Sequence, residues 1–203
     1  MRIYRALELT ADKRFSNHWM MQASYVLSRL EGNYEGLFYS ESSQLDPNIT
    51  AMYDIPSLLV KGYGLLPTDR THVFKAFGGY FFENIPLELS ANFSLQSGTP
   101  ISALGADAAY GVNTGFSLDR GTAGRTPTIW QLDLGAQYSF KIWKSSLAVR
   151  ADIFNVTNEQ RTTAVEQTYN TRDTEPVQNY PYFKMPVAHQ PARRVRLALR
   201  WTF

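Results

Sequence analysis

The side chains that could perform chemistry are few and widely spaced in this 203-residue chain. There is no cysteine, and the three histidines, His18, His72 and His189, form no His-x-x-x-His pair, so we expect neither thiol chemistry nor a metal site. The sequence has no Gly-x-Ser-x-Gly nucleophile motif, and the segment from Gly121 to Gly124 lacks the Lys-Ser/Thr pair of a phosphate-binding loop. A dispersed Ser/His/Asp set is not excluded by counting, but no motif indicates an enzyme or a cofactor.

Two groups of side chains could bind a ligand. Asp46, Asn48 and Asp54 carry oxygens that could bind calcium together with loop carbonyls, although a solvated loop is the simpler interpretation. Aromatic side chains could stack on a sugar or a peptide, although packing within their own loops is favoured. These aromatic residues are Tyr34, Phe38, Tyr39, Tyr53, Tyr63, Tyr169, Tyr180, Tyr182 and Phe183.

The overall composition is that of an ordinary soluble domain. Hydrophobic residues make up 44% of the chain, the mean hydropathy is -0.29 and the formal net charge is +2, which is too small to indicate nucleic-acid binding. No apolar run exceeds three residues, so we expect no transmembrane helix, which would need about 20 apolar residues. The arrangement of the apolar residues contradicts the soluble interpretation.

Apolar and polar residues alternate with a period of two, which is typical of β-strands and not of helices. The alternation is clearest over residues 87–96, 130–141 and 194–203. Less regular segments cover residues 4–15, 19–27, 71–82 and 147–153. We therefore expect seven strands, most of them about 9 to 12 residues long, whereas strands of soluble proteins are most often about 5–6 residues long. Membrane-barrel strands need about 9–11 residues.

The connections between these strands alternate in length. Short turns are expected near Ser16-Asn17, at residues 83–86 and near Trp143-Lys144, and long connections at roughly 29–70, 97–128 and 156–192. Every proline falls in a turn or a long connection, as ladder hydrogen bonding requires. Short periplasmic turns and long extracellular loops are typical of outer-membrane proteins. The predicted fold is therefore all-β, a segment of an antiparallel up-and-down transmembrane β-barrel.

The two faces of the expected strands differ in character. The apolar faces end in large aromatic residues, as interfacial girdles do, namely Trp19, Trp130, Phe140, Trp201 and Phe203. The opposite faces carry charges that suit a polar lumen. We expect these charges to hold a plug or neighbouring strands rather than a substrate; they are Lys75, Asp133, Arg150, Asp152 and Arg196.

The last expected strand ends on a phenylalanine. It resembles the C-terminal signal of bacterial outer-membrane proteins, which the barrel-assembly machinery binds by β-augmentation. The matching residues are Val195, Leu197, Leu199, Trp201 and Phe203. The arginines between them indicate a strand with one basic face rather than a nucleic-acid-binding patch.

Several short strings, in this order, resemble the C-terminal barrel strands of Oar-like TonB-dependent receptors. They are YRALELT (4–10), KRFSN (13–17), ASYVLSR (23–29), DRTH (69–72), QSGTPIS (96–102), AGRTP (123–127) and DIFNVTN (152–158). The resemblance implies a 22-stranded barrel that encloses an N-terminal plug, often preceded by a carboxypeptidase-regulatory-like domain. It implies uptake of a scarce ligand, powered through TonB by the inner-membrane proton gradient.

The chain departs from that family in what it lacks. Met1 leads into Arg2-Ile3-Tyr4-Arg5 without an apolar stretch, so we expect no signal peptide, and no TonB box or plug is recognisable. Residues 1–203 are therefore expected to be the C-terminal portion of a receptor barrel in a Gram-negative outer membrane. Expected partners are outer-membrane lipid, the barrel-assembly machinery, the TonB complex through the missing N-terminal region, and an unknown small ligand or peptide, with no nucleic acid. The alternatives are a passive porin, a small eight-stranded barrel or a soluble β-sandwich binding module.

Overall fold

The computed structural model of the chain describes residues 1–44, 46–47, 50–172 and 179–203. Within these residues the regular structure consists of antiparallel β-strands and two short 3-10 helices, Ser40–Ser42 and Pro56–Leu59. The described part of the chain has no helix that combines the length and the apolar character needed to cross a membrane. The all-β, antiparallel class predicted from the alternation is confirmed.

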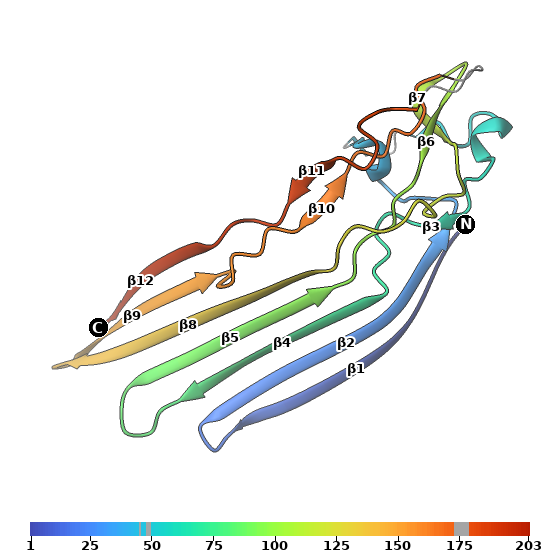
Figure 1. Ribbon diagram of the computed structural model, residues 1–203. Coiled ribbons are helices and arrows are strands. Elements are labelled where there is room, and N and C mark those ends of the chain that lie inside the picture. The colour runs from blue at the N-terminus through green and yellow to red at the C-terminus, as the bar shows by residue number, and fades with distance from the viewer. Residues whose placement is uncertain (45, 48–49, 173–178) are drawn as a thin grey trace.

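Seven long strands lie side by side in chain order and form one curved sheet (Figure 1). They are β1 (Arg2–Ser16), β2 (Trp19–Gly32), β4 (His72–Phe81), β5 (Leu87–Gln96), β8 (Ile129–Ile142), β9 (Ser145–Phe154) and β12 (Arg194–Thr202). A two-residue strand, β3 (Gly64–Leu65), pairs with the end of β2. The sheet is open, with β1 and β12 at its edges, so no closed barrel is found in the described residues.

The pairing register sorts the residues of the sheet onto two faces. One row on the first face runs Lys13–Met21–Gly78–Ala91–Leu134–Ile153–Val195, through directly paired residues of all seven long strands. The row that crosses the other face nearby runs Met20–Gly79–Ser90–Gly135–Asp152–Arg196. Because directly paired residues project to the same side of a sheet, we call these the apolar face and the polar face.

The connections at the two ends of the sheet differ in length. Asn17-His18, residues 82–86 and Trp143-Lys144 link the strands at one end, and residues 33–71, 97–128 and 155–193 link them at the other (Figure 1). Asn17 and His18 both have positive φ, 50° and 67°, as a two-residue hairpin turn with the right-handed twist requires. The first turn is thus one residue later than Ser16-Asn17, the position that the sequence predicts.

The long connections contain regular structure of their own. Two small hairpins form there: β6 (Leu104–Asp107) pairs with β7 (Gly111–Phe116), and β10 (Thr162–Val165) pairs with β11 (Pro186–His189). Pro186 therefore lies in a strand, contrary to the expectation for prolines, but as its first residue, where proline is tolerated. Pro176 lies outside the described residues.

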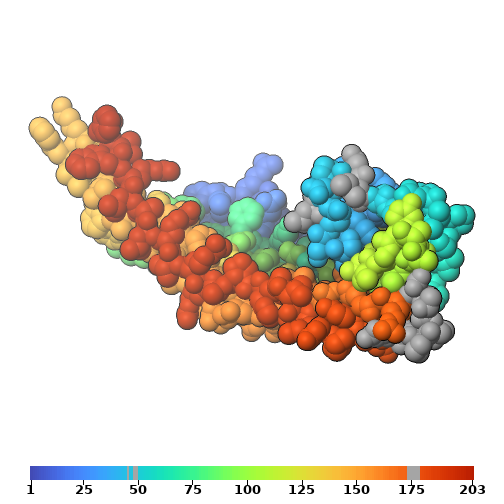
Figure 2. All heavy atoms as spheres, turned by 90° about the horizontal axis from the view of Figure 1, so that it is seen from above, coloured from blue at the N-terminus to red at the C-terminus, as the bar shows by residue number. Residues whose placement is uncertain are grey.

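Most of the buried apolar residues lie among these connections; of the long strands of the sheet, β2 contributes Leu30. Met52, Leu104 and Phe116 pack together in the connections, whereas large side chains of the apolar face are exposed. Figure 2 shows segments of the three long connections gathered at one end of the molecule. Together they form a packed layer beyond the end of the sheet.

Candidate functional site

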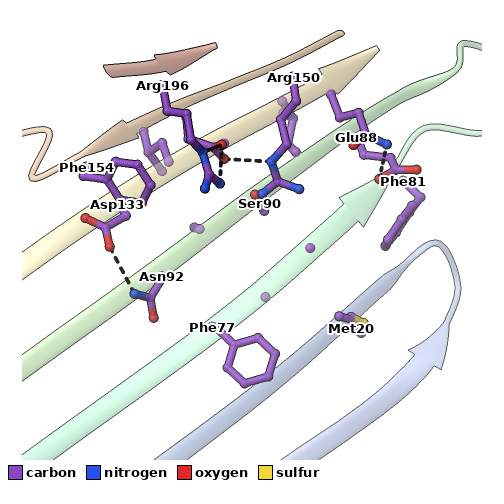
Figure 3. A pocket seen from close by; sticks show the side chains of 18 residues that line it. Met20, Phe77, Phe81, Glu88, Ser90, Asn92, Asp133, Arg150, Phe154 and Arg196 are labelled. Atoms are coloured by element: carbon purple, nitrogen blue, oxygen red, sulfur yellow. Dashed lines mark hydrogen bonds and ion pairs between the residues drawn. The ribbon is translucent and has the colours of Figure 1, made fainter. Parts of the chain in front are cut away.

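A pocket of about 380 Å³ opens on the polar face, above β4, β5, β8, β9 and β12 (Figure 3). Its floor is made of small residues, because Gly79, Ser90 and Gly135 are directly paired neighbours. A Cβ atom on Gly135 would lie 2.5 Å from the Ser90 Oγ and 2.7 Å from an Asp152 carboxylate oxygen. Gly135 therefore has to be glycine for the Asp152 side chain to lie across β8.

Asp152 is the centre of the charged cluster in this pocket. One of its oxygens accepts a hydrogen bond from the Arg150 Nε at 2.9 Å, and the other accepts from the Arg196 Nε and Nη2 at 3.0 and 2.8 Å. Asp152 is only 5% exposed, whereas the arginine side chains are 42% and 59% exposed. The pocket thus presents two guanidinium groups that share one carboxylate, and three of the predicted polar-face charges lie together.

Asp133, another predicted polar-face charge, is held by uncharged donors. It accepts hydrogen bonds from the Gln131 side chain at 2.6 Å, the Asn155 backbone N–H at 2.8 Å and the Asn92 side chain at 3.1 Å. Among the described residues neither Asp133 nor Lys75 forms an ion pair. Asp133 therefore belongs to the same pocket but not to the arginine cluster.

Asn155 is a positioning residue that sequence reasoning missed, although it lies inside the DIFNVTN string. It has a positive φ of 54°, and its side-chain amide donates to the carbonyl oxygens of Glu159 at 2.8 Å and Pro191 at 2.9 Å. It is buried at the end of β9 and joins the two ends of the third long connection beside the polar face. The sequence offers one signal for this role: Asn155 directly follows a strand, and asparagine tolerates the left-handed conformation.

The five residues matched to a C-terminal assembly signal lie at the free edge of the sheet. Val195, Leu197, Leu199 and Trp201 project from the apolar face of β12, directly opposite Ile153, Ala151, Val149 and Leu147 of β9. Phe203 follows the end of β12 and is fully exposed. In the described residues β12 pairs only with β9, so its other edge has unused backbone hydrogen-bonding groups.

A buried ion cluster in the long connections gave no signal in the sequence. The Arg120 side chain is 0% exposed, contacts the Glu41 carboxylate through its Nε (3.0 Å) and Nη2, and lies 3.7 Å from a Glu35 oxygen. The Ser102 hydroxyl donates to the same Glu41 carboxylate at 2.7 Å. Burial near this cluster raises the pKa of the Tyr39 phenol. The cluster joins the first long connection to the second.

The remaining predicted ligand-binding residues do not form one site. Aromatic residues of the last connection pack on each other, with ring centroids 5.0 Å apart for Tyr169–Phe183 and 5.4 Å apart for Tyr180–Tyr182. Of the predicted calcium ligands, Asn48 lies outside the described residues, and Asp54 accepts a hydrogen bond from the Tyr110 hydroxyl at 2.9 Å. The described part of the chain contains no group of three or more His, Cys, Asp or Glu side chains that could hold a metal ion.

The chemistry available on the polar face is recognition by charge and hydrogen bonds. The residues that line the pocket include two arginines, three carboxylates, two amides and one hydroxyl, with no histidine or cysteine among them. These groups can pair with a polar occupant of the pocket.

Comparison with known proteins gives the relationship of the chain. No protein-family model matches it. It is 36% identical, in an alignment of 240 residues, to the TonB-dependent transporter Oar of Myxococcus xanthus. The alignment covers all of this chain, which spans 22% of the length of that relative. The resemblance to Oar-like TonB-dependent receptors is thereby confirmed, and the chain is a relative, over its whole length, of one part of a TonB-dependent transporter.

Proposed function

We propose that this chain forms the last strands of the outer-membrane barrel of a TonB-dependent transporter. The observation that carries the proposal is the 36% identity to the transporter Oar across the whole chain. The chain spans only 22% of that relative, so transport would be a property of the complete protein. Under this proposal a plug and a TonB-contacting segment would be supplied by that longer protein.

The apolar face supports a lipid environment. Leu7 is 56% exposed and lies directly opposite Leu27, and Leu199 is 74% exposed and lies directly opposite Val149. Apolar surface in water costs about 25 cal/mol per Å², so a continuous face of this kind needs a covering. Acyl chains supply that covering, and β-strands of 9 to 15 residues are long enough to span a bilayer.

Aromatic residues lie near both ends of the long strands, where interfacial girdles are expected. Trp19 begins β2 directly after the first short turn, Phe140 lies near the end of β8 at the third, and Trp201 lies near the end of β12. Trp130 lies at the opposite end of the sheet, at the start of β8. This distribution supports a sheet that crosses both interfaces of the membrane.

The orientation follows from the lengths of the connections. Outer-membrane barrels have short turns on the periplasmic side and longer loops outside. The packed layer of long connections is then extracellular and available to a small ligand or peptide. The free edges of β1 and β12 would pair with the remaining barrel strands, because backbone groups in lipid have to be satisfied within the protein.

The pocket on the polar face would then face the lumen. Two arginines that share one carboxylate can each donate a further hydrogen bond to a carboxylate or carbonyl oxygen of a plug or of a neighbouring strand. The plug is therefore the partner that we propose for this pocket in the complete protein. The other proposed partners of the complete protein are the TonB complex, the barrel-assembly machinery and outer-membrane lipid.

Epitope insertion into the full-length protein tests location and orientation together. One tag is inserted between Ala108 and Ala109, in the turn between β6 and β7, and the matched control tag between Glu83 and Asn84, in a short turn. We expect the protein in the outer-membrane fraction, the first tag labelled on intact cells and the second labelled only after permeabilisation. Recovery in the soluble fraction, or labelling of both tags alike, would refute the proposal. Failure to co-purify with TonB would favour a passive porin.

A further inference from the structure

A second groove, on the opposite side of the sheet, is lined by apolar atoms. It has a volume of about 560 Å³ and lies over β2, β4 and β5. Gly78 and Ala91, which are directly paired, form its floor. Larger side chains of the apolar face surround them, namely Trp19, Met21, Tyr80, Leu89 and Leu134. Because the floor residues add at most a methyl group, the hollow can accept an unbranched hydrocarbon chain.

A lysine lies in the same row as the floor of this groove. Lys13 is directly opposite Met21, which is directly opposite Gly78, so its side chain leaves the sheet on the apolar face. Its Nζ lies 4.1 Å from the centre of the Trp19 ring. Trp19 also lines the groove, so the ammonium group is held at the groove's edge.

The acceptors around the Lys13 ammonium group are uncharged. It donates to the Ser16 hydroxyl at 2.7 Å and to the backbone carbonyl oxygens of Ser16 at 3.0 Å and Trp19 at 3.3 Å. Within the described residues no carboxylate pairs with it. A cation at the edge of an apolar groove, without a counter-charge from the chain, favours an anionic group at this place.

We propose that this groove binds one phospholipid molecule, with an acyl chain over Gly78 and Ala91 and the phosphate on Lys13. Both halves of the ligand have a partner, since free phosphate would leave the apolar groove empty and a plain hydrocarbon would leave the charge unpaired. Trp19 and Tyr80 lie beside the short turns, and tryptophan and tyrosine are the residues enriched at headgroup level. The site rests on the proposed function, because acyl chains cover this face only in a bilayer.

Native mass spectrometry of the delipidated full-length protein, titrated with phosphatidylglycerol, tests the site. We expect Ala91→Leu and Gly78→Leu to lose one bound lipid, because the added side chain fills the floor of the groove. Gly78→Leu also brings a Cβ within 3.0 Å of the Met20 carbonyl oxygen, so Ala91→Leu is the decisive variant if Gly78→Leu does not fold. Lys13→Gln should weaken binding by on the order of tenfold, because it removes the positive charge that attracts the phosphate.

Matched controls carry the same changes elsewhere. Ala151→Leu enlarges a small residue on the apolar face outside the groove, and Lys144→Gln removes a lysine whose Nζ lies 5.8 Å from the Trp143 ring centre. Both should bind lipid like the wild type. Unchanged binding by Ala91→Leu, or equal losses in the controls, would overturn the site.

Three further outcomes identify the wrong occupant or the wrong premise. A dimer that Ala91→Leu converts to a monomer, without loss of lipid, would assign the groove to a second copy of the chain and overturn the proposal. Wild-type protein found in the outer membrane that retains no phospholipid refutes the groove alone. Wild-type protein absent from that membrane refutes the proposed function itself.

Discussion

At the residue scale, Asp152 determines how charge is arranged on the polar face. It is buried under two arginines that are themselves about half exposed, so each ion pair is partly screened by water. The carboxylate, in contrast, has little solvent access and depends on its three hydrogen bonds from these arginines. Removal of its charge would leave both guanidinium groups without a fixed partner and free to repel each other.

We therefore expect Asp152→Asn to lower the free energy of unfolding of the full-length protein by about 1–3 kcal/mol, the usual cost of losing hydrogen bonds to a charged group. Asp12→Asn is the matched control, because Asp12 is paired with Gln22 on the same face and forms no ion pair among the described residues. Urea titration in detergent measures both variants. Equal small losses would show that the arginine cluster contributes nothing to stability.

Sequence alternation predicts which residues share a face but not which side chains meet. The alternation predicts that three charged residues at alternate strand positions lie on the polar face, namely Arg150, Asp152 and Arg196. The structure joins all three. Arg120 and Glu41 lie 79 residues apart in irregular connections, where no period relates them. Their contact arises from the packing of the connections and was therefore not predictable from spacing.

At the element scale, the long strands are predictable because each has one apolar and one polar face. The predicted segment 87–96 coincides with β5, and 4–15 falls inside β1. The β6–β7 hairpin was missed because β7 is short and contains Gly111 and Gly115 with Asn113 at a positive φ of 66°, a composition that resembles an irregular loop. Such short hairpins are formed by the packing of the connections around them.

If the apolar face contacts lipid, charge should be tolerated on one side of β2 only. Ala23 projects from the apolar face, opposite Ala11 and Ala76, and its neighbour Gln22 projects from the polar face, opposite Asp12. We expect Ala23→Arg to destabilise the full-length protein by about 2–4 kcal/mol, the cost of an arginine facing the middle of a bilayer. Gln22→Arg, at the same depth, should change stability by about 0.5 kcal/mol or less.

Urea unfolding in phospholipid bilayers measures the difference between these two variants. The comparison separates the face of the sheet from the position along the strand, because the two residues are adjacent. Equal effects of both substitutions would show that water, and not lipid, covers the face that carries Ala23.

At the scale of the whole molecule, the packed core and the sheet are in different environments. Most buried apolar residues lie in the long connections, while the sheet has an exposed apolar face and two free edges. If the chain belongs to an outer-membrane barrel, as we propose, this sheet is complete only when other strands pair with β1 and β12 and lipid covers the apolar face. The chain matches 22% of the length of Oar, so under this proposal the remaining strands would come from a longer protein.

The proposed recognition of β12 by the barrel-assembly machinery can also be tested, because one edge of β12 is free. If the barrel-assembly machinery pairs with this edge and binds the terminal aromatic residue, deletion of Phe203 in the full-length protein should lower its level in the outer membrane several-fold. Phe203→Tyr, which keeps the aromatic ring, should assemble like the wild type. Surface labelling of intact cells, normalised to total protein, measures assembly directly. Unchanged surface levels after the deletion would show that β12 is inserted without recognition of Phe203, and that its alternating residues serve only to face lipid.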